Sequence, residues 1–337
     1  MNMLNVENRF IYHKLTLALA YIKTNNKKWE SMSIETYNVC NLKCTMCPYP
    51  ITKREPHQMS MQQFKHIVDD AISFGINNFC LSHYNEPLMD SLLFERINYI
   101  KSKGMRAGFY SNATLLNEEK IQNIINHNVD YINFSVDGYS KKVYEQIRTG
   151  ADFEIVKQNI LNLIARKTML NKAVPLIMVG FAVQKNNIHE LKQFQEEWRG
   201  LCNVGFWESD NRIENKRTTI EKTKAYPCGL LCGGGLSVMS NGKIPLCCRD
   251  YDGDYLLGDL NHQTVNNIWN SKMLQSYKAL HYNGHGNVIS ICKNCDGLYS
   301  GFVWWMGIYP LNKIGAKLYS IKLNKNQLIE VGVIGHD

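Results

Sequence analysis

Strand-like and helix-like segments alternate between about residues 31 and 207, and this rhythm constrains the fold more than any other feature. Short apolar runs with strand character are separated by segments whose apolar residues recur at helical spacing. Repeated βα units with apolar strands predict an α/β fold with a parallel sheet covered by helices. Six such units favour a partial (βα)6 barrel over a closed eightfold barrel, although periodicity alone leaves closure open. The expected strands are 31–37, 77–83, 105–111, 131–137, 175–184 and 203–209, and the expected helices are 60–74, 88–103, 117–128, 140–147, 153–170 and 188–200.

The character of the chain changes after the sixth unit. Asn241-Gly242 stands between two strand-like runs within 236–248, which predicts a β-hairpin with a type I′ turn. Residues 264–281 follow with a helical pattern, so we expect a small C-terminal domain of β-hairpin and helix. The expected organisation is a helical N-terminal extension (1–30), the partial barrel (31–209), a polar linker (210–225), the small domain (226–300) and a tail (301–337).

Composition narrows the possible partners and location. Hydrophobic residues make up 45% of the chain, enough for a sizeable core. The net charge of +8 is a mild basic bias without Lys/Arg blocks, so no nucleic-acid partner is expected. No apolar run reaches the roughly 18 residues of a membrane span. The N-terminal segment lacks the small-residue cleavage site of a signal peptide, which predicts a cytoplasmic protein with reduced thiols.

Three of the eleven cysteines, Cys40, Cys44 and Cys47, stand at C-x3-C-x2-C spacing directly after the first strand-like run. Buried structural thiols rarely crowd so closely, and a disulfide would leave one cysteine over. Structural zinc needs a fourth ligand, which His57 would have to supply from ten residues away. Thiolates also hold iron–sulfur clusters, for which four cysteines are usual. Three cysteines would leave one iron free to bind a reactant.

The stretch CNLKCTMCP at 40–48 resembles the signature of the radical SAM superfamily. The resemblance implies a [4Fe–4S] cluster whose open iron chelates the amino and carboxylate groups of S-adenosylmethionine (SAM). In that family the reduced cluster cleaves SAM, and the resulting 5′-deoxyadenosyl radical takes a hydrogen atom from the substrate. Met46 stands where the family often has an aromatic residue and is assigned to the cofactor site by the same resemblance.

Further motifs of this family follow successive strand-like runs, where the carboxyl ends of parallel strands form ligand sites. Taken singly, each motif is also explained without a function, as a helix start, a turn or a solvated side chain. The resemblance assigns Glu86 to the SAM amino group, with Asn85 replacing the usual glycine, and pairs Arg148 with the SAM carboxylate. It also assigns Asn112 to the cofactor site and Ser135 or Asp137 to the ribose. His83 and Tyr84 lie at a strand end too, but they receive no chemical role.

A second cysteine set lies in the small domain. The pattern around SNGKIPLCCRD, LGDL, NNIWNS and CKNC resembles the SPASM/twitch extension of radical SAM enzymes, which holds an auxiliary [4Fe–4S] cluster. That resemblance makes Cys228, Cys247, Cys292 and Cys295 the expected ligands. Adjacent strand residues face opposite ways, so Cys247 and Cys248 are not both expected to bind. Whether Cys232 or Cys248 replaces Cys228 or Cys247 as a ligand stays open. A zinc ribbon with four cysteines is the competing interpretation.

The two sets together frame three functional hypotheses. A fully ligated auxiliary cluster can transfer electrons, and the cysteine spacings are similar to those of twitch-type aminocyclitol dehydrogenases. The first hypothesis is therefore net oxidation of a small hydroxylated molecule, with a flavodoxin or ferredoxin as electron donor. The second is modification of a peptide, against which the roughly 30 residues before the first strand count, since recognition domains are larger. The third is a non-catalytic iron–sulfur or zinc protein.

Overall fold

The computed structural model describes residues 28–208, 210–211, 216–217, 228, 231, 235–283, 285–293 and 295. Nearly all of the expected N-terminal extension, most of the linker, Cys232 and the C-terminal tail lie outside these described residues.

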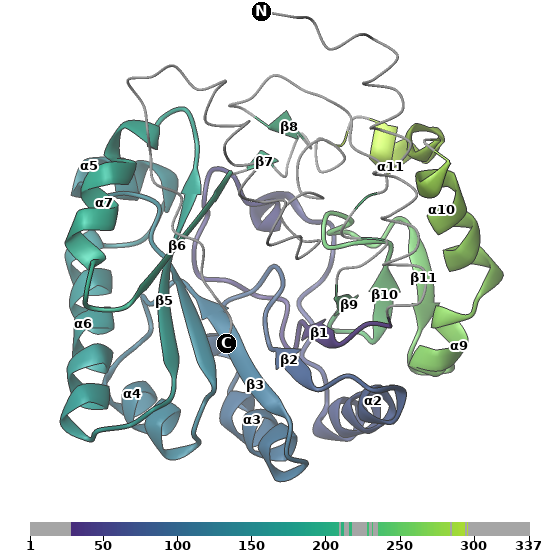
Figure 1. Ribbon diagram of the computed structural model, residues 1–337, viewed down its shortest axis with the longest axis horizontal. Coiled ribbons are helices and arrows are strands. Elements are labelled where there is room, and N and C mark those ends of the chain that lie inside the picture. Colours follow the sequence, from purple (N-terminus) through teal and green to yellow (C-terminus); the bar gives the residue numbers. More distant parts are fainter. Residues whose placement is uncertain are drawn as a thin grey trace, which may run out of the picture.

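A seven-stranded sheet forms the centre of the described fold, with strand order β6-β5-β4-β3-β2-β1-β9 and parallel pairing throughout. The predicted α/β class is confirmed, because the first six strands lie side by side in chain order (Figure 1). The strands are β1 (Ser31–Ile34), β2 (Asn78–Cys80), β3 (Arg106–Ser111), β4 (Tyr131–Ser135), β5 (Leu176–Val183), β6 (Asn203–Glu208) and β9 (Leu236–Val238).

Helices between these strands cover the outer face of the curved sheet (Figure 1). They are α2 (Met61–Phe74), α3 (Leu93–Ser102), α4 (Glu118–Asn126), α5 (Lys141–Ile147), α6 (Phe153–Met169) and α7 (Leu191–Trp198), with 3-10 turns η1 (Tyr49–Ile51), η2 (Pro87–Met89) and η3 (Ile188–Glu190). Several begin at a side chain that caps a free backbone N–H. Ser60, Ser140 and Asp152 each accept a hydrogen bond from the N–H three residues later.

The two faces of the sheet differ in chemistry because side chains alternate along each strand. Phe79, Phe109 and Phe134 are fully buried in the core shared with the helices. On the opposite, inner face the strand register aligns two rows, which are Ser33, Cys80, Gly108 and Tyr131, and then Tyr110, Asn133 and Met178. The inner face is therefore lined largely by polar and small side chains.

The C-terminal region is less separate from the barrel than its sequence predicts. Asn241-Gly242 does form a tight turn, in which Met239 N–H donates to the Lys243 carbonyl at 2.9 Å and Gly242 has φ +83°. The turn is not of type I′, because Asn241 does not have a positive φ, and the flanking strands do not extend the pairing beyond this turn. The wholly buried strand β9 instead pairs in parallel with β1, and β10 (Lys243–Pro245) pairs with β11 (Leu256–Asp259). The turn signal is therefore met, but β9 is buried at the edge of the barrel sheet instead of continuing the hairpin.

Helices complete the small domain. The single helix expected over 264–281 is two, α9 (Val265–Trp269) and α10 (Lys272–Tyr282), because Ser271 accepts a hydrogen bond from Leu274 N–H and starts a new helix. A 3-10 turn η4 (Gly286–Val288) leads to α11 (Ser290–Lys293). Within the predicted linker, β7 (Asp210–Asn211) and β8 (Lys216–Arg217) form a short antiparallel pair. Among the helices described, none has the length and apolar content needed to cross a bilayer.

Candidate functional site

The loop that carries the first three cysteines leaves the carboxyl end of β1 and is held from two sides. Lys43 N–H donates to the Thr149 carbonyl at 3.0 Å, and Thr45 N–H donates to the Ile147 carbonyl at 2.9 Å. On the other side Glu86 N–H donates to the Val39 carbonyl at 2.8 Å. These contacts connect the loop to the end of α5 and to the segment after β2. The loop is therefore fixed at the edge of the sheet where the other predicted site residues lie.

The three thiols of this loop lie near one another in a largely buried setting. Cys44 is 6% exposed, and Cys40, Cys47 and the predicted cofactor residue Met46 are half-buried. Burial, together with the nearby Glu86, Cys44 and Cys47, raises the pKa of Cys40 to about 12. A thiolate at this position therefore needs a compensating positive centre, which a bound iron–sulfur cluster provides.

Two predicted cofactor residues lie beside these sulfurs. Asn112 Nδ2 is 3.8 Å from Cys40 Sγ, and Arg148 Nη1 is 3.6 Å from Cys44 Sγ. N–H groups next to ligand sulfurs are a recurring feature of iron–sulfur sites. Within the described part of the chain, no three His, Cys, Asp or Glu side chains are arranged to hold a single metal ion. The N–H groups of Asn112 and Arg148 beside Cys40 and Cys44 therefore fit an iron–sulfur cluster as the occupant of this loop.

Glu86 joins the ends of β2 and β3. Its carboxylate is 1% exposed and accepts hydrogen bonds from Leu88 N–H (3.1 Å), Ser111 Oγ (2.9 Å) and Asn112 N–H (2.7 Å). Burial raises the pKa of Glu86 to about 7, although these hydrogen bonds and the charge of Arg148 act in the opposite direction. A ligand ammonium group near Glu86 would favour the ionised carboxylate.

Asn85, which replaces the family's glycine, folds its side chain back onto its own turn. Its Oδ1 accepts a hydrogen bond from the N–H of His83, two residues earlier, at 2.8 Å. Its Nδ2 is buried and has no hydrogen-bond partner among the described residues. The substitution therefore keeps the turn and leaves one donor for a ligand.

Asp137 and Arg148, predicted to meet different parts of SAM, lie against each other. Asp137 is fully buried, accepts from Arg148 Nε at 2.6 Å and Nη2 at 2.5 Å, and also accepts from Ala182 N–H at 2.7 Å. Burial alone would lower the pKa of Arg148, but Asp137 outweighs it and the pKa is raised. Ser135 is half-buried at the end of β4 on the inner face. Which of these groups meets SAM stays a prediction.

The second set of thiols also converges. Cys228, Cys292 and Cys295 are each less than 10% exposed. Burial raises the pKa of Cys247, and Cys248, Cys228 and Cys295 add to the shift. Burial likewise raises the pKa of Cys292 to about 12, with Cys228 and Cys295 contributing. The four predicted ligands therefore interact electrostatically, and Arg249 N–H approaches Cys247 Sγ at 3.4 Å.

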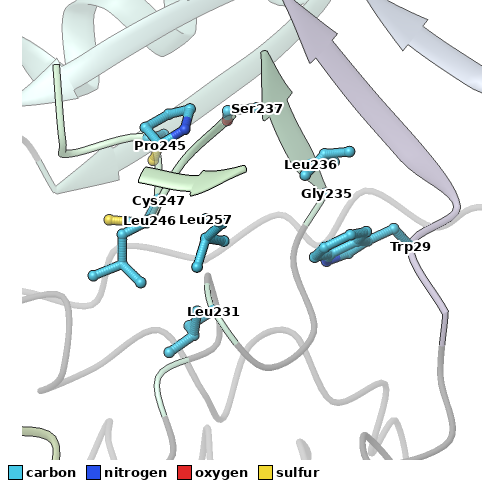
Figure 2. A pocket seen from close by; sticks show the side chains of 10 residues that line it. Trp29, Leu231, Gly235, Leu236, Ser237, Pro245, Leu246, Cys247 and Leu257 are labelled. Carbon is cyan, nitrogen blue, oxygen red and sulfur yellow. The ribbon is translucent and has the colours of Figure 1, made fainter. Parts of the chain in front are cut away.

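A small pocket beside Cys247 shows how apolar these surroundings are (Figure 2). It is lined by Trp29, by Leu236 of β9, by Leu246 and Leu257 near β10 and β11, and by Leu231. Cys247 and Cys248 are on its wall. Such a low-dielectric environment disfavours free thiolates and therefore fits a metal-bound state.

Sequence reasoning missed a buried charged group at the end of β1. Glu35 is fully buried and forms an ion pair with Arg54, which lies in the segment after the cysteine loop. The available signal was a glutamate at an inner-facing position of the apolar run SMSIETY. Its partner comes from a loop whose course the sequence pattern does not predict.

A parallel α/β sheet with three thiols after its first strand and four more converging in a C-terminal module defines an iron–sulfur protein of the partial-barrel class. The family comparison agrees, since the Radical SAM superfamily model matches residues 34–194 and the iron–sulfur cluster-binding SPASM domain matches residues 228–296. The chain belongs to the radical SAM superfamily and carries a C-terminal SPASM domain. These domains imply a [4Fe–4S] cluster, SAM and an auxiliary cluster as its cofactors.

Individual relatives are distant. The tungsten-containing aldehyde ferredoxin oxidoreductase cofactor-modifying protein of Pyrococcus furiosus is 27% identical over 51% of this chain, and the match spans 48% of that relative's length. The S-adenosyl-L-methionine-dependent 2-deoxy-scyllo-inosamine dehydrogenase of Niallia circulans is 20% identical over 81% of this chain and 95% of its own length. A crystal structure of BtrN in complex with AdoMet and 2-DOIA has a TM-score of 0.56 and 15% identity, covering 82% of this chain and 94% of that one, which shows a shared fold.

Proposed function

We propose that this protein is a radical SAM oxidoreductase that oxidises a small hydroxylated molecule of sugar or aminocyclitol type. The observation that carries the proposal is the presence of two thiol sets of different size in one chain. The three cysteines after β1 leave one iron of a cluster without a protein ligand, whereas the four in the small domain can bind every iron. SAM bound at the three-cysteine cluster would supply a 5′-deoxyadenosyl radical that takes a hydrogen atom from the substrate. The chain's own residues then have to hold SAM, hold the substrate and conduct an electron away.

Residues around the first cluster are suited to hold SAM. Glu86 offers a carboxylate for an ammonium group, and Asn85 offers a buried amide N–H without a partner in the described chain. Arg148 carries its charge next to Cys44, where it can meet a carboxylate bound to the adjacent iron. These positions support the assignments of Asn85, Glu86, Asn112 and Arg148 to the cofactor site.

The inner face of the sheet is suited to a polar substrate. Asn133 is 1% exposed, and neither polar atom of its side chain has a hydrogen-bond partner in the described part of the chain. Its register neighbours Tyr110 and Met178 and the half-buried Ser135 lie on the same face. Buried amides without partners indicate that a ligand or water supplies them. The enzyme from Niallia circulans, whose name specifies an aminocyclitol, is similar to this chain over most of both lengths. This similarity supports the proposal of a hydroxylated substrate.

The second thiol set is suited to accept an electron. Four cysteines around one cluster leave no open iron, so such a cluster transfers electrons rather than binding substrate. Loss of a hydrogen atom, a proton and an electron turns an alcohol into a carbonyl group. We therefore assign the auxiliary cluster as the acceptor, and a flavodoxin or ferredoxin as the external donor that reduces the first cluster.

Peptide modification is the second candidate. The mycofactocin maturase MftC of Mycolicibacterium smegmatis is 23% identical over 46% of this chain. The structure of Streptococcus suis SuiB bound to precursor peptide SuiA has a TM-score of 0.57 and 14% identity, covers 88% of this chain and 76% of that one, and shares the fold.

The test uses the full chain reconstituted with iron and sulfide under anaerobic conditions. About eight irons per chain are expected, four per cluster, together with SAM cleavage on reduction. Cys40→Ala, Cys44→Ala and Cys47→Ala should each abolish 5′-deoxyadenosine formation, whereas Cys80→Ala, a thiol on β2, should retain it. Deuterated 2-deoxy-scyllo-inosamine should transfer its label to 5′-deoxyadenosine and yield a ketone. Label transfer only from peptides would favour the second candidate, and SAM cleavage in all three variants would rule out the assignment.

A further inference from the structure

The ends of β1 and β2 hold a buried charged group that the proposed SAM contacts do not use. Glu35 is fully buried, pairs with two guanidinium nitrogens of Arg54, and accepts from Tyr84 N–H at 3.3 Å. Burial opposes ionisation of Glu35, but contacts with His83 and Arg54 outweigh it and lower its pKa to about 2. Glu35 is therefore an anion at neutral pH, fixed at the inner edge of the sheet.

His83 lies against this anion with its far side unpaired. The His83 side chain is 5% exposed, and its Nδ1 is 3.8 Å from Glu35 Oε1. Neither ring nitrogen has a hydrogen-bond partner among the described residues, and the ring packs edge-on against Tyr84 at 4.5 Å. Leaving a buried polar group unpaired costs about 1–3 kcal/mol. A carboxylate at Nδ1 and a free Nε2 is the arrangement that prepares an imidazole to accept a proton.

The segment that carries His83 contacts the loops of both thiol sets, since Glu86 N–H donates to the Val39 carbonyl just before Cys40. His83 precedes Asn85 and Glu86 in the segment after β2, and its main-chain N–H donates to Asn85 Oδ1. The neighbouring Tyr84 donates its hydroxyl to the carbonyl of Cys248 at 2.5 Å, next to the auxiliary ligand Cys247. In the described part of the chain, the charged and titratable groups around His83 are Glu35, Arg54, Tyr84 and, beyond Tyr84, Tyr251.

Oxidation of an alcohol needs a proton acceptor as well as an electron acceptor. The hydrogen atom on carbon goes to the 5′-deoxyadenosyl radical and the electron goes to the auxiliary cluster, so the hydroxyl proton remains to be removed. The other carboxylates at this edge are already engaged by protein donors, Glu86 by three and Asp137 by Arg148 and Ala182. Among the described residues at this edge, His83 offers a nitrogen without such a partner.

We propose that His83 is a catalytic residue whose Nε2 accepts the hydroxyl proton of the substrate as its carbon is oxidised to a carbonyl group. Glu35, held by Arg54, is the positioning residue that orients the imidazole and stabilises its protonated form. The inference rests on the proposed function. In this step the O–H bond breaks, a second C–O bond forms, the proton goes to Nε2, and the electron leaves to the auxiliary cluster.

The test compares His83→Gln and Glu35→Gln with wild type in the reconstituted full chain, using 2-deoxy-scyllo-inosamine as the probe. His127→Gln, a half-buried histidine at the end of α4, is the control. His83→Gln should lower ketone formation by about 100-fold or more, the usual size of a general-base effect. Label transfer into 5′-deoxyadenosine and the calorimetric Kd of the probe should stay within about threefold, and a substrate radical should accumulate by electron paramagnetic resonance.

Glu35→Gln should lower ketone formation less than His83→Gln and should shift the pH profile of ketone formation, which a purely structural role would not do. Imidazole added to His83→Ala should restore part of the ketone. Equal ketone formation by wild type and His83→Gln would overturn the proposal and leave the proposed function standing. Loss of label transfer together with the ketone would mean a binding or structural role and would overturn it too. If wild type cleaves SAM but makes no ketone, the proposed function fails and this inference fails with it.

Discussion

Arg148 joins a buried carboxylate to the cysteine loop, since its Nε lies 2.6 Å from Asp137 Oδ2 and its Nη1 lies 3.6 Å from Cys44 Sγ. Asp137 follows β4 and Arg148 follows α5, so the contact connects the two ends of the segment that contains α5. Both charges are removed from water, and each needs the other to offset desolvation. Arg148 is thereby held in one orientation beside the site of the first cluster.

Arg148→Ala should destabilise the apoprotein by about 3 kcal/mol or more, because it leaves the buried Asp137 uncompensated. Urea denaturation under anaerobic, reducing conditions measures the change. Arg166→Ala is the matched control, since Arg166 pairs with the exposed Glu118 and such pairs contribute about 1 kcal/mol or less. Adding Asp137→Asn to Arg148→Ala should recover part of the loss. Equal destabilisation by the two arginine variants would contradict the contact.

The alternation of strands and helices was predictable because their periodicity is a local property of the sequence. The cysteine spacing was also local, and the structure gathers the four expected auxiliary ligands from Cys228 to Cys295. Long-range pairings were not predictable in this way. The turn at Asn241-Gly242 formed, but β9 joined β1, about 200 residues earlier in the chain.

The site showed the same division. Motif order predicts that Asp137 and Arg148 lie at the edge of the sheet that carries the cysteine loop, but their mutual contact depends on where α5 ends. The pair of Glu35 and Arg54 depends on a loop between β1 and α2, and the buried anion beside His83 is part of that pair. Such contacts are decided by tertiary packing rather than by residue spacing.

Cys292→Ala or Cys295→Ala should lower the iron content from about eight to about four per chain, because the auxiliary cluster loses a ligand. SAM cleavage without substrate should persist, since the first cluster is intact. Cys248→Ala is the matched control, because Cys248 neighbours a ligand and is not expected to be one. Iron and sulfide assays measure the change. A drop in iron for Cys248→Ala that equals the drop for Cys292→Ala would make Cys248 a ligand.

The buried carboxyl of Glu86 should make apoprotein stability depend on pH. Its pKa is raised from 4.5 to about 7, mainly by burial, so the folded state binds its proton more tightly than the unfolded state does. The stabilisation is fully present below pH 4.5 and is lost as pH rises through about 7. Relative to Glu86→Gln, the wild-type free energy of unfolding should fall by up to about 3 kcal/mol by about pH 8.

Urea denaturation of wild type and Glu86→Gln across this pH range measures the difference. The amide cannot accept every hydrogen bond of the carboxylate, which adds an offset that does not vary with pH. Glu118→Gln, at a surface position, is the control and should show no such trend. A difference between wild type and Glu86→Gln that is constant with pH would mean that Glu86 is ionised throughout.

Tyr84 connects the segment after β2 to the loop that follows β10, because its hydroxyl donates to the Cys248 carbonyl at 2.5 Å. The Thr52 hydroxyl and the Lys53 N–H both donate to the Asp252 carboxylate, which makes a second connection to the same loop. Tyr84→Phe removes only the hydroxyl, so the free energy of unfolding should fall by about 1 kcal/mol. Amide hydrogen exchange should become faster over residues 247–252, since local opening requires less free energy.

Tyr99→Phe is the control, because it removes a hydroxyl that donates to Asp69 at 2.6 Å on the outer helices, and it should leave exchange in this loop unchanged. Mass spectrometry of both variants measures the effect, and equal exchange over 247–252 would show that the connection through Asp252 holds the loop by itself.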